Sequence, residues 1–429
     1  MGFVNKNMLE RVRIYTTLRS LLHRLGTVAE ESIQGGFLVT SRIARVLAAS
    51  LVAAGLAAAA ATAAPKSSKS THLLVGINDE AFTLYGDDPP AAFEALQSLR
   101  AQVLRVNMYW GGTKWAVANT KPTNAADPGD PAYDWSLYDR IAGYASTSGI
   151  KLLFSIVDTP SWANHGAGRN HAPSSFTALR QFAQAAAKRY SGSYVDPTAG
   201  TGTPIPAVKL WTAWNEPNNP VFLAPQYKRV HRTWMVLSAY NYARICNAIY
   251  AGIHTVSGEK VACGVTDPRG NDNAGSSRAS VDPLSFLIAA HRYGMKKFDV
   301  YAHNPYASAG REVPSYVPKG RYARRIQLGN IGVLLGLITK YYGPKHLWIT
   351  EYGYQTNPPD RTIMGTSWAK QAADLKQAYA IARKNPRIDM LLWYLVRDEP
   401  SIGGWQSGLE TVTGVHKPAW TAFRNVPRA

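Results

Sequence analysis

The pattern of apolar and polar positions divides the chain after residue 72 into repeating pairs of a strand and a helix. Short apolar runs rich in valine, isoleucine, leucine and aromatic residues alternate with longer segments of helical periodicity, such as 136–149, 175–190 and 367–385. This alternation is typical of βα units that build a parallel sheet. The expected strands are 73–78, 103–109, 151–158, 208–216, 260–265, 298–304, 347–352 and 389–396.

Eight such units predict an α/β fold, a single (β/α)8 barrel, which needs roughly 250 residues and grows by loop insertion. The structural competitor is a doubly wound open sheet, which would normally carry a glycine-rich nucleotide-binding turn after its first strand. The stretch GINDEAFTLYG (76–86) has no GxGxxG motif. Residues 72–429 also contain no Pro/Gly/Ser linker and no short repeat, so we expect one barrel domain there.

The first 64 residues have a different character. The run VLAASLVAAGLAAAAATAA (46–64) follows two arginines and ends in the small-residue pattern ATA, which predicts a secretory signal cut after Ala63. The protein is then secreted. The alternative is an uncleaved membrane anchor, because the run is about long enough to span a bilayer. The preceding segment is too long and mixed for an ordinary signal, so the true start is expected near Val39.

Composition and charge fit a globular protein that is strongly basic. Hydrophobic residues make up 46% of the chain and aromatic residues 11%. Residues 1–64 hold seven Lys/Arg and three Asp/Glu, so removing their +4 from the total of +19 leaves +15. Such a charge could favour nucleic acid, an anionic membrane or an acidic polysaccharide. The basic residues are scattered, however, and the densest cluster, 319–327, predicts a solvated helix face, so no nucleic-acid partner is expected.

The chain contains two cysteines, Cys246 and Cys263, in a predicted helix and the predicted strand after it. Either a buried free pair or one disulfide is possible. No CxxC motif and no His/Cys ligand spacing occurs in the sequence. We therefore expect neither a metal nor an organic cofactor.

Two glutamates, Glu216 and Glu351, each close a predicted strand. Active sites of such barrels lie at the C-terminal strand ends, so both are expected to face one pocket, beneath a long loop at 267–280. Two carboxyls ~5–5.5 Å apart are the geometry of a retaining glycosidase. No GxSxG, Walker A or HExxH motif supports another chemistry. The other polar or aromatic residues at or just after predicted strand ends are Arg105, Asn107, Tyr109, Trp110, Asp158, Trp162, Trp214, Asn215, His303, Asn304, Tyr306, Tyr352, Tyr354, Trp393, Arg397, Asp398 and Glu399.

Four of these strand ends resemble those of the clan A retaining glycoside hydrolases. The motifs are WNEPN (214–218), TEYGY (350–354), LRVNMYW (104–110) and LLWYLV (391–396). The segments 133–163 and 405–423 are similar to those of family 39 and neighbouring family 5 enzymes in particular. The resemblance covers nearly all of 72–425.

The resemblance implies a role for each matching residue. Glu216 is similar to the general acid/base and Glu351 to the nucleophile, while Asn215 resembles the amide that bonds the sugar 2-hydroxyl. Arg105 resembles the guanidinium that keeps the nucleophile ionised, and Trp393 the platform under the sugar. The physical reasons agree, because an acid needs a raised pKa and burial near a second carboxylate supplies it.

The sixth strand departs from the family pattern, which often has His-x-Tyr with the tyrosine bonded to the nucleophile. This chain has AHNPYA, so Tyr306 fills the tyrosine position, Asn304 fills the histidine position, and His303 is one residue early. Tyr306 and His303 are therefore kept as candidate substrate-binding residues, with the role of His303 open.

The expected function is a secreted retaining glycosidase that hydrolyses O-glycosidic, β-type bonds of an oligo- or polysaccharide by double displacement. Two alternatives remain: a catalytically silent carbohydrate-binding barrel at the cell surface, and a transglycosylase that uses the same residues. A monomer with no stable membrane insertion after cleavage is expected. The sugar, the linkage, and exo or endo action stay open.

Overall fold

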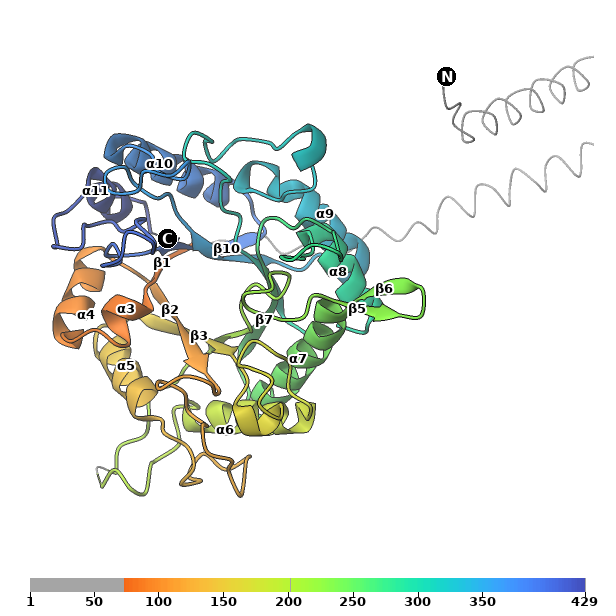
Figure 1. Cartoon of the computed structure of the whole chain (residues 1–429). Coiled ribbons are helices and arrows are strands. Elements are labelled where there is room, and N and C mark those ends of the chain that lie inside the picture. Colours follow the sequence, from red (N-terminus) through yellow and green to blue (C-terminus); the bar gives the residue numbers. More distant parts are fainter. Residues whose placement is uncertain (1–72, 201, 429) are drawn as a thin grey trace, which may run out of the picture. The chain divides into compact units, whose positions relative to one another are not determined.

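The computed structural model describes residues 73–200 and 202–428. These residues form a closed barrel of eight parallel strands with helices around it, as Figure 1 shows in a view into the barrel. The prediction of a (β/α)8 barrel is confirmed. The predicted signal segment, its cleavage site and the alternative start lie outside the described residues.

Each of the eight predicted strands is present in the barrel, and neighbouring strands pair in parallel in the order β1-β10-β9-β8-β7-β4-β3-β2. The observed strand boundaries lie within two residues of the predicted ones, except at the C-terminal end of the fourth strand. The fourth strand ends at Ala213 rather than at Glu216, because Trp214 (φ 69°) and Glu216 (φ 36°) adopt left-handed backbone conformations that turn the chain. The barrel strands in the described residues are β1 (Leu74–Asn78), β2 (Val103–Tyr109), β3 (Lys151–Val157), β4 (Leu210–Ala213), β7 (Lys260–Thr266), β8 (Val300–His303), β9 (Leu347–Tyr352) and β10 (Ile388–Tyr394).

Several helices begin where the sequence supplies a capping side chain. Asp282 accepts hydrogen bonds from the backbone N–H groups of Leu284 and Ser285 at the start of α8, and Ser367 caps α10 in the same way. The α-helices are α3 (Glu80–Thr83), α4 (Pro89–Ser98), α5 (Ser136–Thr147), α6 (Phe176–Arg189), α7 (Leu237–Ile253), α8 (Pro283–Arg292), α9 (Ile331–Tyr342), α10 (Trp368–Lys384) and α11 (Pro418–Arg424). Short 3-10 turns occur at η1 (Ser161–Ala163), η2 (Gly320–Tyr322) and η3 (Leu328–Asn330).

Side chains alternate between the barrel interior and the helix layer, because successive strand residues point to opposite faces. The interior contains a small apolar cluster that includes Val103, Trp348 and Leu392. One step further along the strands, toward their C-terminal ends, the interior becomes polar. The fully buried residues of this polar layer are Arg105, Ser155, Thr212, Asn304 and Thr350.

One element was not anticipated from the sequence. Residues Tyr227–Val230 (β5) and Thr233–Val236 (β6) form an antiparallel hairpin between β4 and α7, and Figure 1 shows it extending away from the barrel. The sequence YKRVHRTWMV has no Asn-Gly or Asp-Gly turn signal, which explains the omission.

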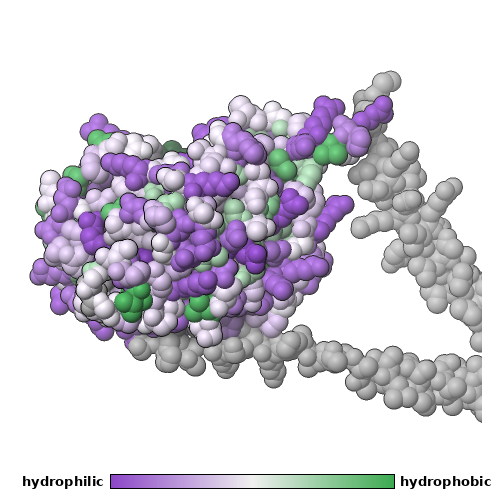
Figure 2. All heavy atoms as spheres, turned by 90° about the horizontal axis from the view of Figure 1, so that it is seen from below, coloured by the Kyte–Doolittle hydropathy of each residue, from purple (hydrophilic) through white to green (hydrophobic). Residues whose placement is uncertain are grey.

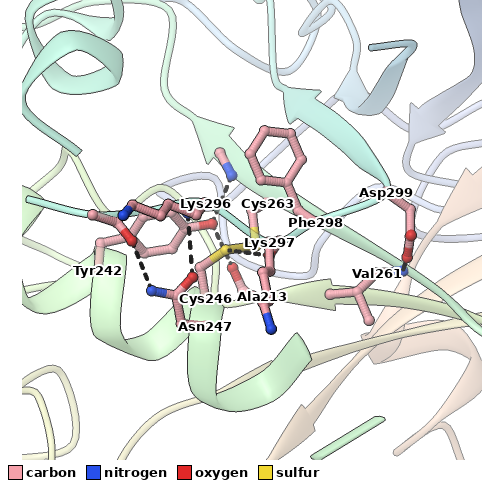
Figure 3. Close-up of a disulfide and its surroundings, with 12 residues drawn as sticks. Ala213, Tyr242, Cys246, Asn247, Val261, Cys263, Lys296, Lys297, Phe298 and Asp299 are labelled. Atoms are coloured by element: carbon pink, nitrogen blue, oxygen red, sulfur yellow. Dashed lines mark hydrogen bonds between the residues drawn. A yellow bond between two sulfur atoms is a disulfide. The ribbon is translucent and has the colours of Figure 1, made fainter. Parts of the chain in front are cut away.

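Helix α7 is joined to the barrel by covalent and hydrogen bonds. Cys246 on α7 and Cys263 on β7 form a disulfide, which settles the pairing that the sequence left open (Figure 3). Nearby, the Tyr242 hydroxyl donates to the Ala213 carbonyl oxygen (2.9 Å) and accepts from the Gly264 N–H (2.7 Å). Both cysteines are fully buried, so the bridge lies between the helix layer and the sheet.

Replacing Cys246 and Cys263 together with alanine is expected to lower the free energy of unfolding by ~3 kcal/mol, the chain-entropy value for a short closed loop. The separation of the two residues is 17 positions. Urea unfolding followed by tryptophan fluorescence would measure the change. Dithiothreitol should lower the stability of the wild-type protein and leave the double variant unaffected; an equal effect on both would show that no such bond forms.

The face drawn in Figure 2 is mostly polar where described residues form it, with small separate apolar areas. Exposed large apolar side chains are dispersed along the sequence, from Val195 to Val415. Within 73–200 and 202–428, no helix has the length and apolar character needed to cross a membrane.

Candidate active site

A cavity of about 790 Å³ opens at the C-terminal end of the barrel strands. Its walls come from residues just after several strands, including β1, β2, β4, β7, β9 and β10, and from the loop at 267–280. Glu216 and Glu351 both line it, as the sequence predicted for one shared pocket. The other charged and aromatic residues at its surface are Glu80, Tyr85, Tyr109, Phe222, Asp267, Arg269, Arg278, Tyr306, Tyr394, Glu399 and Trp405.

Glu351 lies at the end of β9 and is held by one donor on each carboxylate oxygen. The Arg105 guanidinium Nη1 forms an ion pair with Oε1 at 2.5 Å, and the Tyr306 hydroxyl donates to Oε2 at 3.2 Å. Arg105 is itself fixed, because its Nε donates to the Ser155 hydroxyl at 2.8 Å. The polar layer in the barrel interior thus orients the carboxylate of Glu351.

Glu216 lies in the turn after β4 and has a different environment. Its only side-chain hydrogen bond among the described residues comes from the Asn304 amide, which donates to Oε1 at 3.0 Å. Burial raises the pKa of Glu216 well above its usual range, and the negative charges of Asp267 and Glu351 raise it further. Glu216 is therefore protonated under conditions where an exposed glutamate has lost its proton.

Asp267, directly after β7, shares this cavity with Glu216 and also has a pKa raised mainly by burial. The two acids differ in their neighbours. Asp267 accepts a hydrogen bond from the backbone N–H of Arg269 (2.8 Å) and one from the Asn219 amide (3.3 Å). Because these donors and the nearby guanidinium of Arg269 stabilise its charged form, we assign the first ionisation of the pair to Asp267 and the retained proton to Glu216.

Asn215 links the two glutamates through Arg105. The Arg105 Nη2 donates to the Asn215 Oδ1 at 2.9 Å, so the amide nitrogen of Asn215 stays available for another acceptor. Asn304 is held in the same way, because the Thr350 hydroxyl donates to its Oδ1 at 2.7 Å. The amides beside both acids are thus oriented by partners in the barrel interior.

His303 is placed away from the cavity. In β8, Val300, Ala302 and Asn304 face the interior, so His303, one residue out of phase, faces the helix layer. Its Nε2 donates to the Ile326 carbonyl oxygen at 2.9 Å, and its Nδ1 lies 2.7 Å from the Thr266 hydroxyl. Burial lowers the pKa of His303 to about 4, so the ring is neutral. The structure does not bring it to the substrate side.

Trp393 also lies outside the cavity. It is fully buried in the larger hydrophobic core, and its indole N–H donates to the Ser407 carbonyl oxygen at 3.0 Å. The alternation along β10 explains this, since Met390 and Leu392 face the interior. The next residue, Tyr394, lines the cavity together with Trp405, with ring centroids 5.5 Å apart.

Sequence reasoning missed Glu80, a further acidic group in the cavity. Glu80 accepts hydrogen bonds from the Asn107 N–H (2.8 Å) and from the hydroxyls of Tyr109 (2.7 Å) and Tyr85. Burial raises its pKa. Glu80 and Asp267 both follow predicted strands, the first and the fifth, so a complete survey of strand ends could have found them. Trp405 comes from a long loop with no periodic pattern.

The arrangement has the groups that acid/base and nucleophilic chemistry would use: a carboxyl with a raised pKa on Glu216 and a carboxylate paired with Arg105 on Glu351. In residues 73–200 and 202–428, no group of three or more His, Cys, Asp or Glu side chains is placed to hold a metal ion.

Solved structures share this fold, although no protein-family model and no curated protein matches the chain. A family 39 glycoside hydrolase from Bacteroides cellulosilyticus WH2 aligns with a TM-score of 0.55 and 17% identity, over 85% of this chain and 65% of that chain, which is less than two thirds of its length. A glucosidase from Croceicoccus marinus aligns with a TM-score of 0.58 and 14% identity, over 85% of this chain and 68% of that chain. A GH5_18 protein from Bifidobacterium longum subsp. infantis aligns with a TM-score of 0.51 and 15% identity, over 83% of this chain and 78% of that chain. The resemblance that the motifs indicated is thus matched by structures with the same barrel.

Proposed function

We propose that this protein is a retaining glycosidase that hydrolyses O-glycosidic, β-type bonds by double displacement. The observation that carries the proposal is the placement of Glu216 and Glu351 in one cavity with opposite environments. One carboxyl is buried near other acids, and the other is paired with an arginine. A retaining glycosidase requires one carboxyl that stays protonated, to act as the acid, and a second carboxyl that is ionised, to act as the nucleophile.

In the first step, Glu351 attacks the anomeric carbon and Glu216 gives its proton to the leaving oxygen. The ion pair with Arg105 and the hydrogen bond from Tyr306 hold the attacking carboxylate in one orientation. Oε2 of Glu216 has no hydrogen-bond partner among the described residues, so this oxygen is available to the leaving group. The products are a covalent glycosyl-enzyme and the released alcohol.

In the second step, Glu216, now a carboxylate, takes a proton from water, and the oxygen of that water attacks the anomeric carbon. The bond to Glu351 breaks, and the sugar leaves with the configuration it had in the substrate. Asn304 holds Glu216 through Oε1 in both steps. Asn215, with its amide nitrogen free, is positioned to donate to a sugar hydroxyl.

The platform role expected for Trp393 passes to Tyr394 and Trp405, whose rings face the cavity. Trp405 is only half-buried and lies 5.2 Å, centroid to centroid, from Tyr306. A flat aromatic face next to the nucleophile suits the apolar face of a sugar ring.

The anomer formed first by the wild-type enzyme tests the mechanism. Proton NMR during hydrolysis of aryl β-glycosides should show the β-anomer before mutarotation, whereas an inverted first product would exclude Glu351 as nucleophile. Tight binding of oligosaccharides without product would instead indicate a carbohydrate-binding barrel. Glycosyl transfer to an added sugar in place of water would indicate a transglycosylase.

Export of the protein is part of the proposal. The disulfide between Cys246 and Cys263 supports it, because such bonds persist in oxidising compartments. N-terminal sequencing of protein recovered from the medium should give a chain that begins at Ala64.

Replacing Asp267 with asparagine is expected to move the alkaline limb of the pH profile of kcat/KM to lower pH. Glu216 must be protonated in the free enzyme, so activity falls as pH rises through its pKa. The negative charge of Asp267 raises that pKa, and a neutral amide removes the contribution. Profiles on a substrate with a poor leaving group measure the shift. The matched control is Asp87→Asn, an exposed acid outside the cavity, which should leave the limb in place; a limb unmoved in Asp267→Asn would contradict the assignment.

A further inference from the structure

A second hollow of about 330 Å³ adjoins the catalytic cavity beside the loop at 267–280. Asn219, Asp267, Arg269 and Arg278 line both spaces, so the two lie side by side. Arg325 lines the hollow from a different segment. The proposed catalytic steps leave this hollow without a role.

The hollow lies on the acid side of the site. The Asn219 N–H donates to the Glu216 carbonyl oxygen at 2.9 Å, and Asp267 is the strongest charged neighbour of the Glu216 carboxyl. Arg105 and Tyr306, which hold Glu351, do not line the hollow. Since Glu216 faces the leaving oxygen, the part of the substrate beyond that oxygen extends toward the hollow.

The hollow has a net positive charge. Three guanidinium groups, those of Arg269, Arg278 and Arg325, face one carboxylate, that of Asp267, which gives +2. The Arg278 guanidinium has no hydrogen-bond or ion-pair partner among the described residues. The Arg325 guanidinium lies over the Tyr322 ring at 3.9 Å, a contact that leaves its N–H edge free.

The remaining arginine, Arg269, is only loosely paired, with its Nε 3.9 Å from the Asp267 carboxylate. By contrast, Arg324, next to Arg325 in the chain, forms a close ion pair with Asp282 at 2.8 Å. Unpaired guanidinium groups around a concave space suit the planar oxygens of a carboxylate or the oxygens of a sulfate.

The arginine-bearing loop is held rigidly to the segment that carries Glu216. Asn218, fully buried, donates to the Val281 carbonyl oxygen (2.9 Å) and accepts from the Asp267 N–H (2.8 Å), so it fixes both ends of the loop. Within the loop, the Asn271 side chain accepts from the Ser280 N–H at 3.1 Å. A fixed loop lets its arginines bind a ligand without a cost for ordering the backbone.

We propose that this hollow is a leaving-group subsite for an anionic sugar unit, one that carries a carboxylate or a sulfate ester. The inference rests on the proposed function, because Glu216 as the acid defines the leaving-group side. It restricts the substrate class to glycans with acidic units beyond the cleaved bond. Neutral chains lack the group that the three arginines would bind.

Titration calorimetry on the full chain with three tetrasaccharides tests the proposal. An oligogalacturonate supplies carboxylates, a sulfated chondroitin fragment supplies sulfates, and cellotetraose is the neutral reference. We expect at least one anionic probe to bind roughly tenfold or more tightly than cellotetraose, since a hydrogen bond to a charged group contributes about that factor. Raising NaCl from 20 to 500 mM should remove the preference. No preference for either anionic probe would overturn the proposal. Comparing the affinities for the two anionic probes shows whether the hollow prefers a carboxylate or a sulfate.

The variants Arg278→Ala and Arg325→Ala should each weaken binding of the preferred anionic probe roughly tenfold. Arg180→Ala removes the same charge from an exposed position on α6 outside both spaces and is the matched control. Equal losses in all three variants would also overturn the proposal. Hydrolysis of aryl β-glycosides and of the anionic probes by the wild-type protein is measured separately. Turnover without anionic preference refutes the subsite alone, and no turnover of any of these substrates refutes the glycosidase.

Discussion

Replacing Glu351 with alanine is expected to reduce kcat/KM by a factor on the order of 10⁴–10⁶, the range seen when a covalent nucleophile is removed. The loss is large because no other carboxylate is held by Arg105 and Tyr306 in the described part of the cavity. Kinetics on aryl β-glycosides would measure it. Added azide should restore part of the turnover by entering the space that the side chain leaves.

The product of that rescue identifies the role of Glu351. Direct attack by azide on the substrate gives a glycosyl azide of inverted configuration, an α-azide from a β-glycoside, which NMR distinguishes. Glu94→Ala, an exposed acid on α4, is the control for a lost carboxylate and should keep full activity. Near wild-type turnover in Glu351→Ala would remove the nucleophile assignment.

A stability measurement must accompany the Glu351 variant. Arg105 is fully buried, and removal of its partner leaves an uncompensated charge, at a cost of about 3–5 kcal/mol. Glu351→Gln keeps the shape and an acceptor oxygen next to Arg105. Loss of activity in the glutamine variant with a wild-type melting temperature separates lost chemistry from lost folding.

Replacing Glu216 with alanine is expected to lower kcat/KM about 10²–10⁴-fold on substrates with poor leaving groups, the usual contribution of a general acid. Substrates with good leaving groups, such as dinitrophenyl glycosides, should still form the glycosyl-enzyme, because their departure needs no proton. The alkaline limb of the pH profile should disappear with the acid that causes it.

Azide again distinguishes the residues. In Glu216→Ala it attacks the glycosyl-enzyme on Glu351 from the opposite face, so the glycosyl azide keeps the configuration of the substrate. Retained product from this variant and inverted product from Glu351→Ala together assign the pair. An equal loss on good and poor leaving groups would contradict the acid role of Glu216.

The sequence predicted the placement of Glu216 and Glu351 in one cavity more reliably than the placement of the residues around them. Glu216 and Glu351 were found because each ends an apolar strand, a local pattern that barrel topology turns into proximity. His303 and Trp393 were selected by resemblance of motifs, although the alternation of side chains along β8 and β10 places both toward the helix layer. That alternation could have been read from the sequence, since Val300, Ala302, Met390 and Leu392 set the phase of each strand.

The sequence by itself determined the barrel, because strand and helix periodicity depends on neighbouring residues and eight such units have one common way to close. Only the tertiary structure decided which side chains meet. Arg105 pairs with Glu351 across 246 positions, and the charge of Asp267 raises the pKa of Glu216 from a different strand. The arginine-lined hollow likewise depends on how Asn218 fixes one loop. Burial, charge coupling and loop position act through space, so no local pattern along the chain records them.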